Sequence, residues 1–439
     1  MRTSERVSPS AKTSETVPFL QGILNWRPAT DGRVVLLAVV AIYFAVVALA
    51  RTVWRFDLWP ILGVPSGPSL FFDARNLTAA WECSRGGYDP LYDNPCDPWG
   101  RPLMYLRPWL VFAPLGLDQS HTFVLGVTLI IAVFVVFSLL VGRVPLGTGL
   151  ILALAACSPS VMFALERGNM DVALFLLVTL AVLLWRTFPV PASVVSPILV
   201  VLAASAKLYP VAALPAFVLT RSRLASRTAV ACLVVFAIYC VYSFRDIVHV
   251  ADIATQGQEF SYGARILPAH IYHQIGADRW AGPAAVKQAL AAFPLAVLAA
   301  FIVFVVRTRL GPHSGATDDG PAATASLLAL HIGALIYLGT FAAANNFDYR
   351  LVFLLLVLPQ LATWARDGAH RLSSLAAVNV VAMLVLLWIG SLSQQLRLWD
   401  ELASWVVAGL LTALLAATLP SAESIRASVF GRAGRPAAP

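Results

Sequence analysis

The chain has 439 residues, of which 59% are hydrophobic and only 12% are charged. Its mean hydropathy of +0.76 is far above that of a soluble protein of this length, so the composition predicts a polytopic membrane protein. A formal net charge of +8 would favour nucleic acid as a partner of a soluble chain. Here the Lys and Arg residues lie in short pieces between apolar runs, which is how membrane topology is specified, and we expect no nucleic-acid partner.

The apolar runs predict an all-α membrane domain over residues 34–419. Residues 1–33 are polar and predict a disordered cytoplasmic tail, and the run at 34–54 is too long for a signal-peptide core. Further runs are close to the roughly 20 residues that cross about 30 Å of hydrocarbon. They predict helices at 121–142, 145–163, 171–187, 228–244, 286–306, 325–343, 351–366, 373–391 and 400–419, before a cytoplasmic tail at 420–439.

Residues 193–220 decide the topology, because Lys207, Tyr209 and Pro210 divide them into two short pieces. A hairpin here gives about twelve transmembrane segments and two cytoplasmic termini. The cytoplasmic pieces then hold 17 Lys and Arg against 7 Asp and Glu, and the outer pieces hold 14 against 16, which is the asymmetry of a correctly oriented chain. One Pro-kinked helix over 197–219 would instead give eleven segments. The charge distribution favours twelve.

In the twelve-segment topology, all the unusual polar sequences lie on the outer face. They are the large loop 55–120, which is expected to carry short helices, the turn 166–171, the hairpin tip 207–210, the loop 245–285 and the turn 345–350. The cytoplasmic loops are short and basic. The sequence therefore predicts one extracytoplasmic site assembled from distant segments.

The motifs at these positions resemble those of a known enzyme class. FFDARN follows the first helix, a G-x-DP-x-Y turn comes next, and ERGNMD, AKLYP and NNFDYRLVFLLLVLPQL follow in order. Together they are similar to the GT-C class of polyprenyl-phosphate-dependent glycosyltransferases, specifically the GT87 (DUF2029) group of bacterial α-mannosyltransferases. The resemblance spans about residues 34–400 and implies a GT-C-like bundle that transfers a sugar on the outer face of the bacterial cytoplasmic membrane. It also implies that the functional carboxylate of the group falls on Asp73.

The chemistry can also be argued from the reaction. Inverting transfer from a sugar phosphate needs one carboxylate as general base for the acceptor hydroxyl, and cations to neutralise the departing phosphate. Asp73 is the candidate base, and its alternative role is an N-cap for the helix that follows. Asp89 and Asp93 are better explained as turn residues. Tyr88, Tyr92, Trp99 and Tyr105 would stack on sugar or anchor the membrane interface.

The candidate substrate-binding residues are polar groups near the membrane boundary. The residues of ERGNMD could have a structural role instead of binding substrate. Glu166, Asn169 and Asp171 can cap the next helix, and Arg167 can pair with Asp171 at i, i+4. Lys207 sits where the backbone breaks, and its alternative is snorkelling to the interface. Arg350 could pair locally with Asp348. The complete set is Arg107, Arg167, Asn169, Asp171, Lys207, Tyr209, Asn346, Asp348 and Arg350.

The remaining polar motifs give weaker signals. Cys83 and Cys96 share the first outer loop and are a disulfide candidate, with two free thiols as the alternative. His270 and His273 in the second loop could touch the acceptor, and His331 lies within an apolar helix. No metal-ligand spacing is present, so we expect no metal and no cofactor.

The sequence thus predicts a membrane glycosyltransferase, a hexosyltransferase of cell-envelope biogenesis. Its partners would be a polyprenyl-phosphate-linked sugar, a lipid or glycan acceptor and membrane lipids, and the resemblance alone favours mannose. The alternative is a multi-pass transporter or flippase, because a Lys on a broken helix is also typical of transporter sites. Against it, the polar motifs lie at one face of the membrane.

Overall fold

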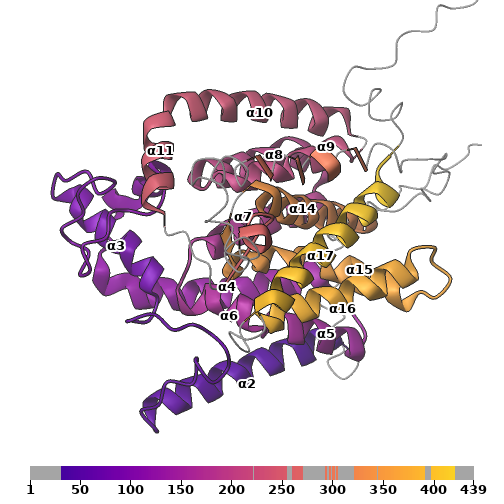
Figure 1. The fold of residues 1–439 in the computed structure, drawn as a ribbon, viewed down its shortest axis with the longest axis horizontal. Helices are drawn as coiled ribbons and strands as arrows, with labels where there is room; N and C mark the ends of the chain where they lie inside the picture. Colours follow the sequence, from indigo (N-terminus) through magenta and orange to yellow (C-terminus); the bar gives the residue numbers. More distant parts are fainter. Residues whose placement is uncertain are drawn as a thin grey trace, which may run out of the picture.

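The computed structural model describes residues 31–220, 222–254, 260–269, 321–343, 345–390 and 397–420, with scattered positions between 292 and 304. The chain is an all-α membrane protein (Figure 1). Its first half contains α2 (Gly32–Thr52), α3 (Phe72–Arg85), η2 (Arg107–Leu115), η3 (Gln119–His121), α4 (Thr122–Val141), α5 (Leu146–Ala156), α6 (Pro159–Glu166), α7 (Asp171–Thr187), α8 (Pro189–Ala206), η4 (Tyr209–Ala213) and α9 (Pro215–Val218). The second half contains α10 (Arg223–Tyr242), α11 (Phe244–Ile253), α14 (Pro321–Ala343), η6 (Asp348–Leu356), α15 (Leu358–Arg366), α16 (Ser373–Ile389) and α17 (Arg397–Thr418).

The helices differ in how much of their surface the protein itself covers. In α14, 78% of the most apolar 18-residue window is buried, against 17% in α2. An apolar helix that buries so little against protein has a surface suited to lipid tails. In Figure 1, α2 and α10 lie along opposite edges of the bundle with α7 and α14 between them, so the buried centre lies around α7 and α14.

Six helices are long and apolar enough to cross a membrane, or up to eight if each of two bent pairs is one span. The twelve predicted segments are therefore not all found among the described residues. Tyr209–Val218 and Ser373–Ile389 are apolar but short, and most of the predicted helix at 286–306 lies outside the described residues.

Proline explains where several of the predicted segments break, because it removes a helical hydrogen bond and clashes with the preceding turn. Pro159 starts α6, which is bent by 54° from α5, and Pro359 lies at the start of α15, which is bent by 52° from η6. The helix α8 ends at Ala206, and Lys207 has extended backbone before Pro210 enters η4. α8 begins at Pro189, so this piece is longer than the sequence suggested.

Two short strands from distant parts of the sequence form a two-stranded antiparallel sheet. β1 (Ser261–Tyr262) belongs to the second predicted outer loop, and β2 (Asn346–Phe347) to the turn before η6. The amide of Asp348 also donates to the carbonyl of Phe260 at 2.8 Å. The ladder therefore holds residues 260–262 beside the 345–350 turn.

The predicted tails and loops are described to different extents. Residues 1–30 and 421–439 of the predicted tails, and both His270 and His273, lie outside the described residues. The loop 55–120 is described throughout and carries α3, η2 and the start of η3, which confirms that it contains short helices.

Candidate functional site

The turn between α6 and α7 is where the predicted site residues meet. α6 ends at Glu166 and α7 begins at Asp171, so the backbone of Arg167, Gly168 and Asn169 leaves the helix. Gly168 has a φ of 56°, and a Cβ atom there would lie 3.0 Å from the Cβ of Ala74. Only glycine combines this backbone with so close an approach of α3. The turn can therefore face α3 directly.

Asp73, in the first turn of α3, receives three hydrogen bonds from this turn. Arg167 donates from Nη2 to Oδ1 at 2.7 Å and from Nε to Oδ2 at 2.9 Å. Asn169 donates from Nδ2 to Oδ2 at 2.6 Å. A bidentate guanidinium contact fixes both the position and the plane of a carboxylate. The orientation of Asp73 is thus set by residues more than 90 positions away in the sequence.

The backbone holds the same two segments together. The amide of Phe71 donates to the carbonyl of Glu166 at 3.0 Å, and the amides of Asp73 and Ala74 donate to the carbonyl of Arg167 at 2.9 and 3.3 Å. These bonds satisfy amides that a helix start leaves without intrahelical partners. Phe71 itself has a left-handed backbone. Helix α3 is therefore anchored through its first turn to the turn at 167–169.

Phe71 is held from its other side by α4. A Cβ atom on Gly126 would lie 2.4 Å from ring atoms of Phe71, which no real contact permits. Glycine at position 126 is therefore what allows the aromatic ring to lie against α4. This contact is made two residues before Asp73.

A second carboxylate collects two cations from further along the chain. Asp171 is fully buried and forms ion pairs with Lys207 through Oδ1 and with Arg350 through Oδ2, the latter at 3.3 Å. Arg350 also donates from Nη1 to Oδ1 of Asn346, whose Nδ2 donates to the carbonyl of Thr340 at 2.6 Å. The turn at 166–171 thus contacts α3 through Arg167 and Asn169, and the Lys207 and Arg350 segments through Asp171.

Aromatic rings surround the cations. The ammonium of Lys207 lies 5.5 Å from the ring centre of Tyr105 and 5.4 Å from that of Tyr349. The guanidinium of Arg350 lies 5.1 Å from the ring of Tyr209. Cations within about 6 Å of a ring are attracted to its face. We call Asp73, Arg167, Asp171, Lys207 and Arg350 the charge cluster.

The charge cluster contains three cations and two carboxylates, so it carries one excess positive charge. Lys207 is 17% exposed, Arg350 18% and Asp73 13%, whereas Asp171 is completely covered. The carboxylate that holds the cations is thus inside, and the cations reach the surface. Such an arrangement favours an anion that approaches from the exposed side.

Asp73 is held in its ionised form. Burial raises the pKa of its carboxyl group, but the charge of Arg167 and the hydrogen bonds from Arg167 and Asn169 lower it, and the pKa ends below its usual 3.8. Three of its lone-pair positions are occupied among the residues that the structure describes, which leaves one on Oδ1. A carboxylate in this state can accept one further hydrogen bond.

Three alternative roles of these residues are wrong. Phe71, not Asp73, is the N-cap residue of α3. Arg167 pairs with Asp73 rather than with Asp171, and Arg350 pairs with Asp171 rather than with Asp348. The Lys207 side chain is directed to Asp171 and is 17% exposed, and its snorkelling to a membrane interface stays a prediction.

Arg107 is not brought into the charge cluster. Its guanidinium forms ion pairs with Asp89 at 2.8 Å and with Asp246 of α11 at 2.6 Å, and 44% of its side chain is exposed. Both acids hold the pKa of Arg107 above its usual value. These contacts join the loop 55–120 to α11, and the predicted role of Arg107 in substrate binding stays a prediction.

The other predicted residues lie near the charge cluster with different surroundings. Tyr209 and Asn346 contact Arg350, as described above. Asp348 is 1% exposed, and neither of its carboxylate oxygens has a hydrogen-bond partner within the described residues. Tyr92 lies elsewhere, with its ring 4.3 Å from that of His249 and its hydroxyl donating to Asp246. Of the candidate sugar-stacking residues, only Tyr105 touches the cluster.

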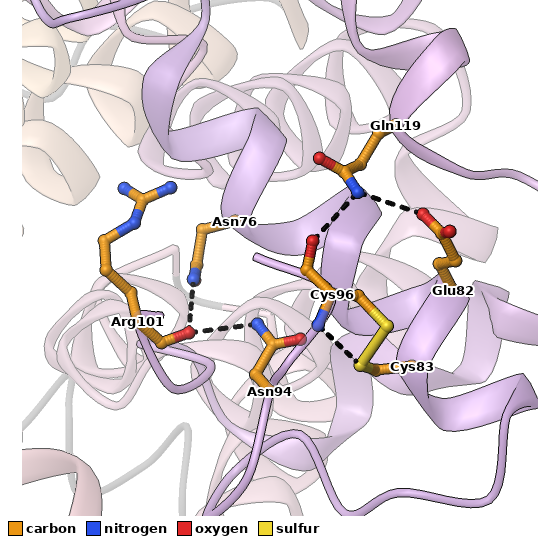
Figure 2. The surroundings of a disulfide bond; sticks show 7 residues. All are labelled: Asn76, Glu82, Cys83, Asn94, Cys96, Arg101 and Gln119. Atoms are coloured by element: carbon orange, nitrogen blue, oxygen red, sulfur yellow. Dashed lines mark hydrogen bonds between the residues drawn. A yellow bond between two sulfur atoms is a disulfide. The ribbon is translucent and has the colours of Figure 1, made fainter. Parts of the chain in front are cut away.

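Cys83 and Cys96, the disulfide candidate of the loop 55–120, are bonded, with Cα atoms 5.6 Å apart (Figure 2). Gln119 lies over the bond and donates to the carbonyl of Cys96 at 2.9 Å and to Glu82 at 3.0 Å. The disulfide joins the last turn of α3 to the loop that follows it. It therefore closes a short covalent ring around one end of the helix that carries Asp73.

Removing this disulfide is expected to destabilise the protein. A cross-link that closes a loop of this size stabilises a fold by about 3 kcal/mol, mainly by restricting the unfolded chain. We expect Cys83→Ser/Cys96→Ser to lower the melting temperature of the detergent-purified protein by several degrees, whereas Cys240→Ser, at a free thiol, leaves it unchanged. Equal melting temperatures for the double variant and the wild type would contradict this expectation.

Sequence reasoning missed three contributors to the site. Glu166 belongs to the turn predicted to bind substrate but not to the set of candidate residues, and its Oε1 accepts the amide of Gly67 at 3.2 Å while its carbonyl accepts the amide of Phe71. Phe72 and Arg101 were not singled out, although the ring of Phe72 lies 5.2 Å from the guanidinium of Arg167. The sequence signal for Phe72 is that it is an aromatic residue directly before Asp73. No local pattern pointed to Arg101.

Within the described part of the chain, no group of three or more His, Cys, Asp or Glu side chains could hold a metal ion. The comparisons with known proteins returned no match to a family model, to a curated protein or to a solved structure.

Proposed function

We propose that this protein is a membrane glycosyltransferase that moves one sugar from a polyprenyl phosphate to an acceptor hydroxyl at the charge cluster. The observation that carries the proposal is an ionised carboxylate with one open acceptor position beside three cations with an excess positive charge. Such a pairing suits a reaction in which a proton is removed from one partner and an anionic phosphate leaves the other.

In the proposed reaction, the acceptor oxygen attacks the anomeric carbon of the donor while its proton passes to Oδ1 of Asp73. The bond between the anomeric carbon and the phosphate oxygen breaks, and the electron pair leaves with the polyprenyl phosphate. Lys207 and Arg350 stabilise the negative charge that develops on that phosphate, because their charges exceed that of Asp171. A single displacement of this kind inverts the anomeric configuration.

The wider assignment rests on the sequence motifs. Their resemblance to the GT-C class supports mannose as the sugar, a lipid or glycan as the acceptor, and the outer face of a bacterial cytoplasmic membrane as the location. The charge asymmetry between loops supports about twelve transmembrane segments with the charge cluster outside. The ladder between β1 and β2 agrees with that topology, because it joins two segments that the topology assigns to one face.

The proposal is tested by substituting the two cations that Asp171 holds. Lys207→Gln and Arg350→Gln are each expected to raise the KM for a radiolabelled polyprenyl-phospho-sugar about tenfold or more. A hydrogen bond to a charged group contributes about 1.5–3 kcal/mol, and each 1.4 kcal/mol is a factor of about ten. The measurement is transfer to extracted membrane lipids in proteoliposomes.

Arg85→Gln is the matched control, because Arg85 is an exposed cation of the first outer loop that lies outside the charge cluster and donates to the carbonyls of Ala113 and Leu117. Its KM is expected to stay at the wild-type value. Movement of labelled lipid across the bilayer without formation of a glycosylated product would instead identify the protein as a transporter or flippase. Unchanged KM values in both cation variants would remove the phosphate-binding role.

A further inference from the structure

Arg101 forms a connection between the first outer loop and the residue before Asp73. Its guanidinium carbon lies 3.6 Å from the ring centre of Phe72, which is a stacked contact. Its Nη2 also donates to the carbonyl oxygen of Phe72 at 3.1 Å. One side chain therefore holds both the backbone and the ring of Phe72.

Arg101 is itself rigidly held. Asp97 accepts its Nη2 at 2.8 Å and its Nε at 3.2 Å, and Asp97 is 3% exposed. A planar guanidinium bound to a carboxylate through two nitrogens has little freedom to rotate. Asp97 in turn accepts the backbone amide of Trp99 at 2.9 Å and the side-chain amide of Asn76 at 3.2 Å.

The loop segment that carries Arg101 runs along the whole of α3. The Cys83–Cys96 disulfide attaches it at the end of the helix, and Asn76 donates to the carbonyls of Arg101 and Pro102 nearer the beginning. In Figure 2 the guanidinium of Arg101 points away from the disulfide. Residues 94–102 therefore hold α3 from its last turn to its first.

We infer that Arg101 is a positioning residue for Asp73, acting through Phe72. Asp73 follows Phe72 directly, and its amide donates to the carbonyl of Arg167 at 2.9 Å. The ring of Phe72 also lies 5.2 Å from the guanidinium of Arg167, which binds the carboxylate of Asp73. Arg101 thus supports the residue that contacts both members of this ion pair. Its role in transfer rests on the proposed function, whereas its hold on the first turn of α3 does not.

The experiment compares Arg101→Ala with Arg85→Ala, because each removes an arginine that ties α3 to the first outer loop. Arg85 binds the carbonyls of Ala113 and Leu117 from the last turn of the helix. In Arg101→Ala we expect kcat to fall about ten- to a hundredfold with KM for the donor unchanged, since small displacements of a reacting group have effects of this size. In Arg85→Ala we expect kcat to stay near the wild-type value, with a smaller loss of melting temperature, because only Arg101→Ala removes the partner of the buried carboxylate of Asp97. Arg101→Lys keeps the charge but not the planar stack, and is expected to lie between the wild type and Arg101→Ala.

Amide hydrogen exchange tests the same inference without activity. Arg101→Ala is expected to speed exchange about tenfold or more in the peptide covering 71–74, whose amides bind the carbonyls of Glu166 and Arg167, and Arg85→Ala is not. A wild type that catalyses no transfer, with this exchange response intact, would reject the proposed function and leave the hold of Arg101 on α3. Unchanged exchange at 71–74, or an equal loss of kcat in both alanine variants, would overturn the positioning role.

Discussion

Asp73→Asn is expected to abolish most of the sugar transfer, lowering kcat by about 10²- to 10⁴-fold, the usual contribution of a positioned general base. The amide has almost the same shape as the carboxylate and can still accept from Arg167 through its oxygen. It cannot take a proton from an acceptor hydroxyl. The loss should therefore appear in kcat, measured as product formed at saturating donor, with folding monitored by the melting temperature.

Asp93→Asn is the matched control for this substitution. Asp93 is an exposed carboxylate in the same outer loop and belongs to a turn rather than to the charge cluster. Its kcat is expected to remain within a factor of about two, because no charged group at the reacting centre changes. Glu166→Gln tests whether Glu166, the other carboxyl group next to Arg167, is the general base in place of Asp73. Full transfer by Asp73→Asn with loss of transfer in Glu166→Gln would move the general base to Glu166.

Asp171→Asn is expected to have the largest effect on stability. Asp171 is fully buried and holds both Lys207 and Arg350. Removing one member of a buried ion pair costs about 3–5 kcal/mol, because the remaining charge is left without its partner. We expect a lower melting temperature and greater sensitivity to protease, in addition to the loss of transfer.

Asp89→Asn provides the comparison on the exposed side of the molecule. The ion pair between Asp89 and Arg107 is 44% exposed on both sides, and exposed pairs contribute about 0–1 kcal/mol. Its melting temperature is expected to fall by at most a degree or two. Similar losses in the two variants would show that the cations of the charge cluster do not depend on Asp171.

The sequence predicted the helical parts of the fold because they depend on local properties. Apolar runs of sufficient length placed α2, α4 and α14, and Pro210 marked a real break. The single helix predicted at 145–163 is wrong, because Pro159 starts a new helix there. The number of spans was harder to predict, because hydropathy does not distinguish a helix that crosses the membrane from a short or bent piece buried in protein. Length and burial in the folded chain decide that difference.

The site was predictable in its members but not in its pairings. An i, i+4 pair of Arg167 with Asp171 needs a continuous helix, and the left-handed Gly168 interrupts it. Once the helix is broken, each side chain takes its partner from another segment. Arg107 likewise takes a distant partner, because α11 supplies Asp246. Such pairings join residues that lie about 90 to 180 positions apart in the sequence, which no local pattern reveals.

The contact between Gly126 and Phe71 restricts which sequences this architecture can tolerate. Position 126 lies in an apolar helix where alanine, leucine or valine would ordinarily be interchangeable. Any of these would force the aromatic ring away, and with it the start of the helix that carries Asp73. Sequence change in α4 is therefore constrained at this buried position by the packing of another helix, α3.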